Sequence, residues 1–403
     1  MSTTLGNLLR LSVRATRVHR RWITIIPKRT RVERHSSLLP ETWIISDDNA
    51  ITNYSTAGVA HALGLPVETK RVTPQPTIPI IGQLSGLRSL FGESSNGKLS
   101  CVEDAYTESM PRFAIAATRQ ALPGLLEIRK RTDGRTMTVY LGLPDTKLSN
   151  VDALLLTRLD QMKLRSIGPG RANLDNAIST LLPISGLSPI TPVSAPDPSV
   201  VICIGTGFEP SGFRLLTTDY DRIVDGILHL PLSRIRIVMD PEPNRGMRTA
   251  LESRVVKRIR EQPIDPNSTK KPVTDVEVID YAVGGQPPLA EVLASATHVI
   301  ATADNIPVIS MAVSMGLPVY IAGMERVSNE LRSYYHMLDG RNLVRRFYPQ
   351  NSRYSYMLAP DITGNVDEFS AIRDHDPWGT YDAQQDLSDV AEFIKERYIE
   401  INS

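Results

Sequence analysis

Three polar residues with ligand-binding chemistry, Thr302, Asp304 and Asn305, follow the short β-branched run His298–Ala301. Their hydroxyl, carboxylate and amide groups can donate or accept hydrogen bonds. The same groups also cap helices, because they can bind the free N–H groups of a first turn. We therefore expect a ligand-binding turn here, with helix capping and turn chemistry as the alternative for each residue.

The stretch from 298 to 321 contains the elements that would position these residues. The predicted order is strand, loop, helix from Pro307 to Met315, and second strand from Pro318 to Ile321. Pro307 suits the first turn of a helix, and Gly316 ends it. Two strands joined by a short crossover helix imply a parallel sheet, and ligands of such sheets lie beyond the carboxyl ends of the strands.

Two further polar turns are candidates for the same site. Gly284 and Gly285 follow one predicted strand, and Ser46 and Asp47 end the first predicted strand of the chain. We expect Ser46 and Asp47 to face the turn after residue 301 across a cleft between two domains, where binding sites are common.

Other motifs carry weaker signals. The sequence has no G-x-S-x-G elbow, no phosphate loop ending in Gly-Lys-Ser/Thr and no H-E-x-x-H. The turn Gly205-Thr206-Gly207 could approach a phosphate, but it lacks the third glycine of the dinucleotide fingerprint. Asp219 and Asp221 form a D-x-D pair that could hold a metal or favour a helix N-terminus. With seven scattered histidines and two cysteines, we expect no metal site.

Hydrophobic patterns divide the 403-residue chain into two α/β domains. Residues 39–181 are predicted to form the N-terminal domain, residues 182–199 a stiff, solvated Pro-rich linker, and residues 200–365 the C-terminal domain. Residues 366–403 are a tail whose helix could pack on either domain. Besides the stretch from 298 to 321, strands are predicted at Trp43–Ser46, Phe113–Ala117, Met137–Leu141, Val151–Thr157, Val200–Ile204, Ile235–Met239 and Val273–Val278, and helices at Thr52–Leu63, Arg119–Arg131, Asp219–Leu228, Met247–Glu261 and Leu387–Ile401.

The first 38 residues differ in composition from the rest. They carry nine of the 45 Lys and Arg residues and one of the 44 acids, which leaves 36 basic and 43 acidic residues in the body. An acidic body has no electrostatic footprint for nucleic acid. The Arg-rich head is typical of a mitochondrial targeting segment that the import machinery binds, with a basic surface arm as the alternative. No apolar run reaches the roughly 20 residues of a transmembrane helix, so we expect no transmembrane segment.

Several motifs together carry a family resemblance. They are Trp43-Ile44-Ile45-Ser46-Asp47, Gly58, Ala62-Leu63-Gly64, Thr118-Arg119, Arg158-Leu159-Asp160, Gly284-Gly285-Gln286-Pro287 and, most specifically, the stretch from Thr302 to Tyr320. This set resembles the mitochondrial fission family named after the plant "elongated mitochondria" protein. The resemblance implies two facing Rossmann-like domains, similar to the B-type glycosyltransferase fold. It also implies adaptors that bring a dynamin-related GTPase to mitochondria in plants, and sugar-nucleotide transferases among bacterial relatives.

The sequence departs from the pattern of that family at three positions. Asp48 and Ile51 stand where glycine is expected, and Met311 stands where an acid is expected after Ser310. In related transferases an acid there holds the ribose hydroxyls of a nucleotide, and a methionine sulfur is a weak acceptor. The resemblance therefore implies a degraded donor site.

Two functions follow as hypotheses. The first is a non-enzymatic mitochondrial adaptor or scaffold in fission and mitochondrial organisation. The second is a glycosyltransferase with a sugar-nucleotide donor bound by Asp304 and Asn305 and with Asp47 near the acceptor.

Overall fold

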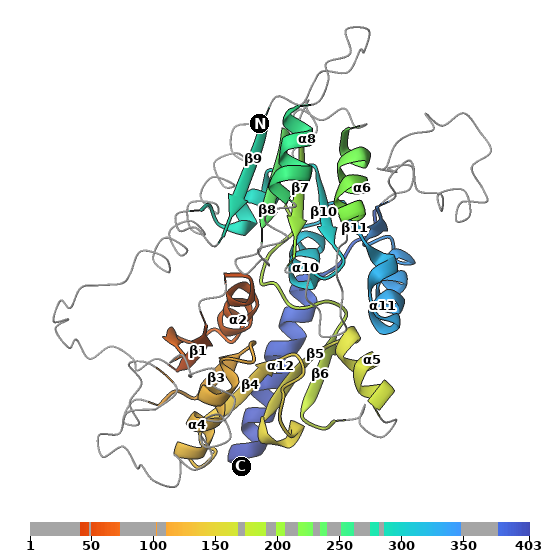
Figure 1. Cartoon of the computed structure of the whole chain (residues 1–403). Helices are drawn as coiled ribbons and strands as arrows, with labels where there is room; N and C mark the ends of the chain where they lie inside the picture. Colours follow the sequence, from red (N-terminus) through yellow and green to blue (C-terminus); the bar gives the residue numbers. More distant parts are fainter. Residues whose placement is uncertain are drawn as a thin grey trace, which may run out of the picture. The chain divides into compact units, whose positions relative to one another are not determined.

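The computed structural model describes residues 41–47, 50–72, 102, 110–167, 174–190, 199–205, 217–228, 234–239, 251–261, 275–281, 286–347 and 378–403 (Figure 1). These ranges form two six-stranded sheets, and the strands of each sheet pair in parallel. The expected α/β class with two Rossmann-like domains is confirmed. The head, residues 1–38, lies outside the described residues.

The first sheet has the strand order β2-β1-β3-β4-β5-β6. Its strands are β1 (Thr42–Ser46), β2 (Val67–Arg71), β3 (Phe113–Ala116), β4 (Met137–Leu141), β5 (Ala153–Thr157) and β6 (Ala177–Thr180). The connecting helices are α2 (Ala50–Ala62), α4 (Leu122–Arg131) and α5 (Arg158–Ile167). β1 and β3 are buried along their whole length, as expected for parallel strands covered on both faces.

The second sheet has the order β12-β11-β10-β7-β8-β9. Its strands are β7 (Ser199–Ile204), β8 (Arg234–Met239), β9 (Asp275–Asp280), β10 (His298–Thr302), β11 (Val319–Ala322) and β12 (Arg345–Arg346). Its helices are α6 (Thr217–Leu228), the π-helical turn Leu251–Val256, α8 (Lys257–Arg260), α9 (Leu289–Ala294), α10 (Ile306–Ser314) and α11 (Asn329–Asp339). The predicted order of strand, loop, helix and strand from 298 to 321 is confirmed as β10, α10 and β11.

The sequence patterns missed several elements, including the edge strands β2, β6 and β12. β2, β6, α5, α9, α11 and β12 were not predicted. β2 (VETKR) is a partly exposed edge strand without a run of apolar residues, so its pattern resembles that of a loop. Of the helix predicted at Met247–Glu261, the described part is a π-helical turn followed by four α-helical residues, and residues 247–250 lie outside the described residues.

Residues 182–185 are buried or half-buried, so the prediction of a solvated linker is wrong for these residues, whereas Gly186, Ser188 and Pro189 are exposed. Leu182 and Ile184 are buried in hydrophobic clusters. The Ser310 hydroxyl of α10 donates a hydrogen bond to the Pro183 carbonyl, and Ile190 N–H donates to the Met315 carbonyl at 3.0 Å. These bonds satisfy backbone groups that a solvated linker would leave to water.

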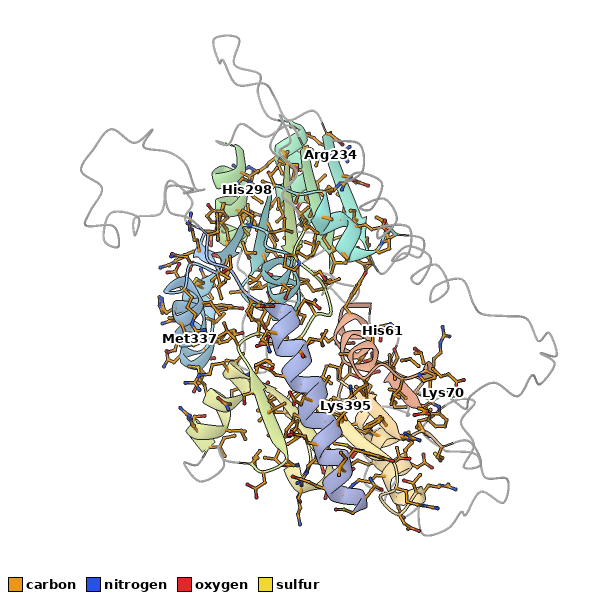
Figure 2. The ribbon with its side chains drawn as sticks, turned by 180° about the vertical axis from the view of Figure 1, so that it is seen from behind. His61, Lys70, Arg234, His298, Met337 and Lys395 are labelled. Atoms are coloured by element: carbon orange, nitrogen blue, oxygen red, sulfur yellow. The ribbon has the colours of Figure 1, made fainter. Side chains whose placement is uncertain are left out.

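The C-terminal helix α12 (Ala383–Asn402) packs against the first sheet, although the chain between β6 and α12 forms the second sheet. Val390, Ala391 and Ile394 are buried in the cluster that contains residues of β1, β3 and β4. Lys395, labelled in Figure 2, lies on the exposed side of this helix. Among the described residues, no helix is long and apolar enough to cross a membrane.

Candidate functional site

The turn between β10 and α10 is held together by Thr302. Its hydroxyl donates a hydrogen bond to Asp304 Oδ1 at 2.5 Å and accepts one from the Gly205 N–H at 2.9 Å. Thr302 is buried and Asp304 is partly exposed. The carboxyl ends of β10 and β7 therefore meet through these three residues, as their neighbouring positions in a parallel sheet require.

Gly205 has no room for a side chain at this junction. A Cβ added to Gly205 would lie 2.5 Å from Asp304 Oδ2. The glycine at the end of β7 thus lets the Asp304 carboxylate approach the backbone closely. Thr206 and Gly207 lie outside the described residues, so the rest of this predicted phosphate turn stays a prediction.

Asn305 stands immediately before α10, at the N-cap position, but does not cap it with its side chain. Its side chain makes no capping hydrogen bond, and its backbone N–H donates to the Thr302 carbonyl at 2.9 Å. From α11, the Tyr335 hydroxyl donates to the Ala303 carbonyl at 2.5 Å. The turn is therefore held from both sides, and no local pattern pointed to Tyr335 because 32 residues separate it from Ala303.

Tyr220 is a buried tyrosine of α6 near the same turn. Its hydroxyl has no hydrogen-bond partner among the described residues. Burial raises the pKa of Tyr220, and the nearby carboxylates of Asp304 and Asp219 raise it further. A buried hydroxyl without a partner keeps unused hydrogen-bonding capacity beside the turn. Sequence reasoning missed this residue, and only its place one position after Asp219 could have suggested it.

The two carboxylates of the D-x-D pair each bind arginine. Asp219 is buried and forms an ion pair with Arg326, with Oδ2 2.6 Å from Nε and Oδ1 accepting from an NH2 group at 3.0 Å. Asp221 accepts hydrogen bonds from Arg254 at 2.8 Å and from Arg258 at 3.2 Å. These contacts offset both charges, and the described residues contain no group of three or more potential metal ligands.

Met311, where an acid was expected, belongs to the hydrophobic core. It is 2% exposed, and its neighbours from Val308 to Ser314 are also buried. α10 carries no acidic side chain. An ionised acid at position 311 would lose its hydration, which is costly without a partner.

Ser46 and Asp47 lie at the carboxyl end of β1 in the first sheet. The Ser46 hydroxyl donates a hydrogen bond to Asn53 Oδ1 of α2 at 2.7 Å. Asp47 is close enough to Tyr140 of β4 to raise the pKa of that phenol. The structure thus joins Thr302 and Asp304 through hydrogen bonds, whereas Ser46 has a partner of its own. Gly284 and Gly285 lie outside the described residues.

One hollow among the described residues lies elsewhere. It has a volume of about 560 Å³ and is lined by Leu126, Arg129, Lys130, Asp133, Gly134 and Asn150. These residues include the carboxyl end of α4, which precedes the amino end of β4. The hollow therefore does not adjoin the carboxyl ends of the strands, where the candidate residues lie.

The sequence matches the model of one protein family over most of its length. The model described as Mitochondrial fission ELM1 matches residues 52–230 and 266–366, which together are more than half of the sequence. The chain belongs to this family. The resemblance carried by the motifs is thereby confirmed, and the ELM1 family is one of mitochondrial fission. No curated protein sequence matches the chain.

Several solved structures are similar in fold to this ELM1-family chain. The S. aureus MnaA-UDP co-structure is 10% identical, covers 88% of this chain and 96% of its own, and has a TM-score of 0.49. A putative UDP-N-acetylglucosamine 2-epimerase from Listeria monocytogenes is 13% identical with the same coverages and a TM-score of 0.45. MurG from Acinetobacter baumannii is 10% identical, covers 88% of this chain and all (100%) of its own, and has a TM-score of 0.41.

Proposed function

We propose that this chain is a non-enzymatic adaptor in mitochondrial division that holds a dynamin-related GTPase at the mitochondrial surface. The observation that carries the proposal is Met311, a core residue on a helix without any acid. A sugar-nucleotide transferase needs hydrogen-bond acceptors for the ribose hydroxyls, and a buried thioether is a poor one.

The polar groups of the β10–α10 turn support the same proposal. The Thr302 hydroxyl donates a hydrogen bond to the Asp304 carboxylate and accepts one from the Gly205 N–H. The two D-x-D carboxylates are bound by arginines. A donor would therefore have to displace internal bonds that already stabilise the fold.

A glycosyltransferase with a sugar-nucleotide donor is the second candidate. It is favoured by the Tyr220 hydroxyl, which is buried near Asp304 and has no partner among the described residues. A ligand hydroxyl or phosphate could complete this hydrogen bond. In this case Asp304 and Asn305 would contact the donor, and Asp47 would lie near the acceptor.

Thermal unfolding with a panel of UDP-, GDP- and ADP-sugars separates the two candidates. A bound ligand stabilises the folded chain by about 2.7 kcal/mol at a hundredfold excess over its Kd. The adaptor proposal expects no stabilisation by any donor. Stabilisation that is lost in Tyr220→Phe, with Tyr398→Phe on α12 as a matched control, would favour the transferase.

A rescue experiment tests the adaptor directly. Cells that lack the chain should have elongated mitochondria and less of the GTPase on them, and Asp304→Asn should restore both as well as the native chain does. If Asp304→Asn failed to restore them, the function would depend on the candidate donor-binding residue, and this would contradict a non-enzymatic adaptor. Recruitment that is unchanged without the chain would contradict the adaptor itself.

Recruitment of a cytosolic GTPase requires the folded chain to lie on the cytosolic side of the mitochondrial membrane. A cleaved targeting segment at residues 1–38 would send the body inside the organelle, whereas an adaptor for a cytosolic GTPase must face outward. Protease treatment of intact mitochondria should digest a C-terminal tag if the proposal holds. A protected tag on a shortened chain would count against it.

A further inference from the structure

The hollow at the amino edge of the first sheet is formed by three neighbouring segments. They are the end of α4, the turn that contains Asp133 and Gly134, and the 3-10 turn Leu148–Asn150. α4 packs against β4, which begins shortly after the first of these turns (Figure 1). The volume of about 560 Å³ lies in the range of about 300–1,000 Å³ that is usual for ligand sites. The hollow is on the opposite edge of the sheet from the candidate residues Ser46 and Asp47.

Arg129, which lines the hollow, is fixed by a buried carboxylate. Its Nε and Nη2 groups donate to Asp152 Oδ1 at 3.0 and 2.8 Å. The Asp152 side chain is 6% exposed, and its Oδ2 accepts from the Thr138 N–H and hydroxyl at 2.9 and 2.7 Å. A guanidinium group has five N–H donors, and these bonds use two of them. The edge between Nη1 and Nη2 therefore keeps three donors, and Nη1 has no partner among the described residues.

The other lining side chains add a second cation, an acid, an amide and an apolar surface. Lys130 is exposed and forms no ion pair with any described residue. Asp133 is also exposed, and its left-handed φ of +49° belongs to the turn that ends α4. The Asn150 amide donates to the Thr146 hydroxyl at 2.9 Å, and Leu126 is half-buried. An anion in the hollow would thus meet a guanidinium edge and an ammonium group.

We propose that this hollow binds the carboxylate of an aspartate or glutamate side chain of a partner polypeptide. The free edge of Arg129 matches the two oxygens of a carboxylate, and Lys130 adds a third contact. The two cations are balanced by Asp133 and Asp152, so the hollow has no excess charge for a phosphate dianion. The volume far exceeds one carboxylate, and Leu126 offers apolar surface to neighbouring residues of a peptide. The site rests on the proposed adaptor function, because an adaptor needs a surface that recognises another protein.

Peptide binding to the full chain tests this site. Four Gly/Ser octapeptides with blocked termini would carry glutamate, glutamine, phosphoserine or lysine at the centre, and saturation-transfer NMR would measure their affinity. The glutamate peptide should bind with a Kd of about 1 mM or below, whereas the glutamine and lysine peptides should not bind. Phosphoserine should bind no more tightly than glutamate, because the nearby acids oppose a second negative charge. Equal binding of glutamate and glutamine, no binding of glutamate, or about tenfold tighter binding of phosphoserine would overturn the proposal.

Variants locate the binding. Lys130→Gln should weaken the glutamate peptide about threefold, as expected for loss of one exposed charge, and it tests the site even if Arg129→Lys fails to fold. Arg129→Lys keeps the charge but loses the planar edge, so it should weaken the peptide about tenfold. Lys395→Gln removes an exposed lysine of α12 (Figure 2) and should leave the affinity unchanged. Equal losses in Lys130→Gln and Lys395→Gln, or no loss in Lys130→Gln, would overturn the site.

GTPase recruitment in cells distinguishes this inference from the adaptor proposal. If Lys130→Gln recruits the GTPase normally and the glutamate peptide does not bind, the carboxylate site is wrong and the adaptor stands. If the glutamate peptide binds but recruitment does not depend on the chain, the adaptor is wrong and the site serves another partner.

Discussion

The backbones of Gly58 and Gly186 are in direct contact. A Cβ added to Gly58 would lie 2.5 Å from the Gly186 Cα, and one added to Gly186 would lie 2.6 Å from the Gly58 Cα. Gly58 is on α2, and Gly186, with a φ of +64°, is in the segment that follows β6. This close approach lets α2 pack against the segment from 182 to 190, which also binds α10 through the Ser310 hydroxyl.

Gly58→Ala should destabilise the chain although alanine favours helices. The added methyl group forces two backbones apart, and overpacking of this kind costs about 1–3 kcal/mol, whereas helix propensity alone would gain about 1 kcal/mol. Urea unfolding of this variant measures the net effect. Ser55→Ala on the same helix is the control and should be neutral or stabilising. A Gly58→Ala protein as stable as the native chain would contradict the contact.

Ile394→Ala should show that α12 is part of the first core. Ile394 is fully buried against the first sheet, and truncation of such a side chain costs about 2–5 kcal/mol. Ile399, on the same helix, is 67% exposed, so Ile399→Ala should change stability by less than about 0.5 kcal/mol. Equal effects of the two variants in urea unfolding would mean that α12 is not packed as described.

Arg326→Met should leave the Asp219 carboxylate buried without its arginine. The Asp219 side chain is 5% exposed, and breaking a buried ion pair in this way costs about 3 kcal/mol. The control is Arg254→Met, whose partner Asp221 is 32% exposed and keeps Arg258, so a loss below about 1 kcal/mol is expected. If Arg254→Met lost more stability than Arg326→Met in thermal or urea unfolding, the difference in burial between Asp219 and Asp221 would be refuted.

Tyr140 should make the chain less stable at alkaline pH. Its pKa rises from 10.0 to about 12 on folding, so between these values the folded chain holds a proton that the unfolded chain has lost. Stability therefore falls as pH rises through this window, by about 2–3 kcal/mol in total. The urea midpoint of Tyr140→Phe, measured from pH 9 to 11.5, should decline less steeply than that of the native chain. Parallel declines would contradict the shift.

The local pattern of the sequence predicted the central elements well. The alternation of apolar runs with polar turns gave β7, β8, β10 and α10 nearly as they are observed. β7, β10 and α10 are almost entirely buried, so continuous apolar residues are the direct consequence of their position, whereas in β8 Arg234 is exposed and Arg236 half-buried. Family membership also followed from motifs in the sequence, because the most specific of them includes the β10–α10 turn.

The roles of individual site residues needed the fold. Asp304 lies beside Gly205 only because β10 and β7 are paired. Along the chain, 97 residues separate Gly205 from Thr302, to which its N–H donates. The D-x-D pair had the spacing of a metal site, but arginines from α8, the π-helical turn and the Met324–Arg326 turn bind it instead. Spacing along the chain cannot reveal partners that folding brings from elsewhere.

The sequence by itself determined the α/β class, the family and the helical nature of the C-terminal tail, because these depend on periodicity and local motifs. Only the tertiary structure decided that α12 packs on the first sheet and that residues 182–185 are packed rather than solvated. The physical reason is that an apolar helix face specifies burial but not the surface that buries it. That choice depends on which complementary surface the rest of the chain forms.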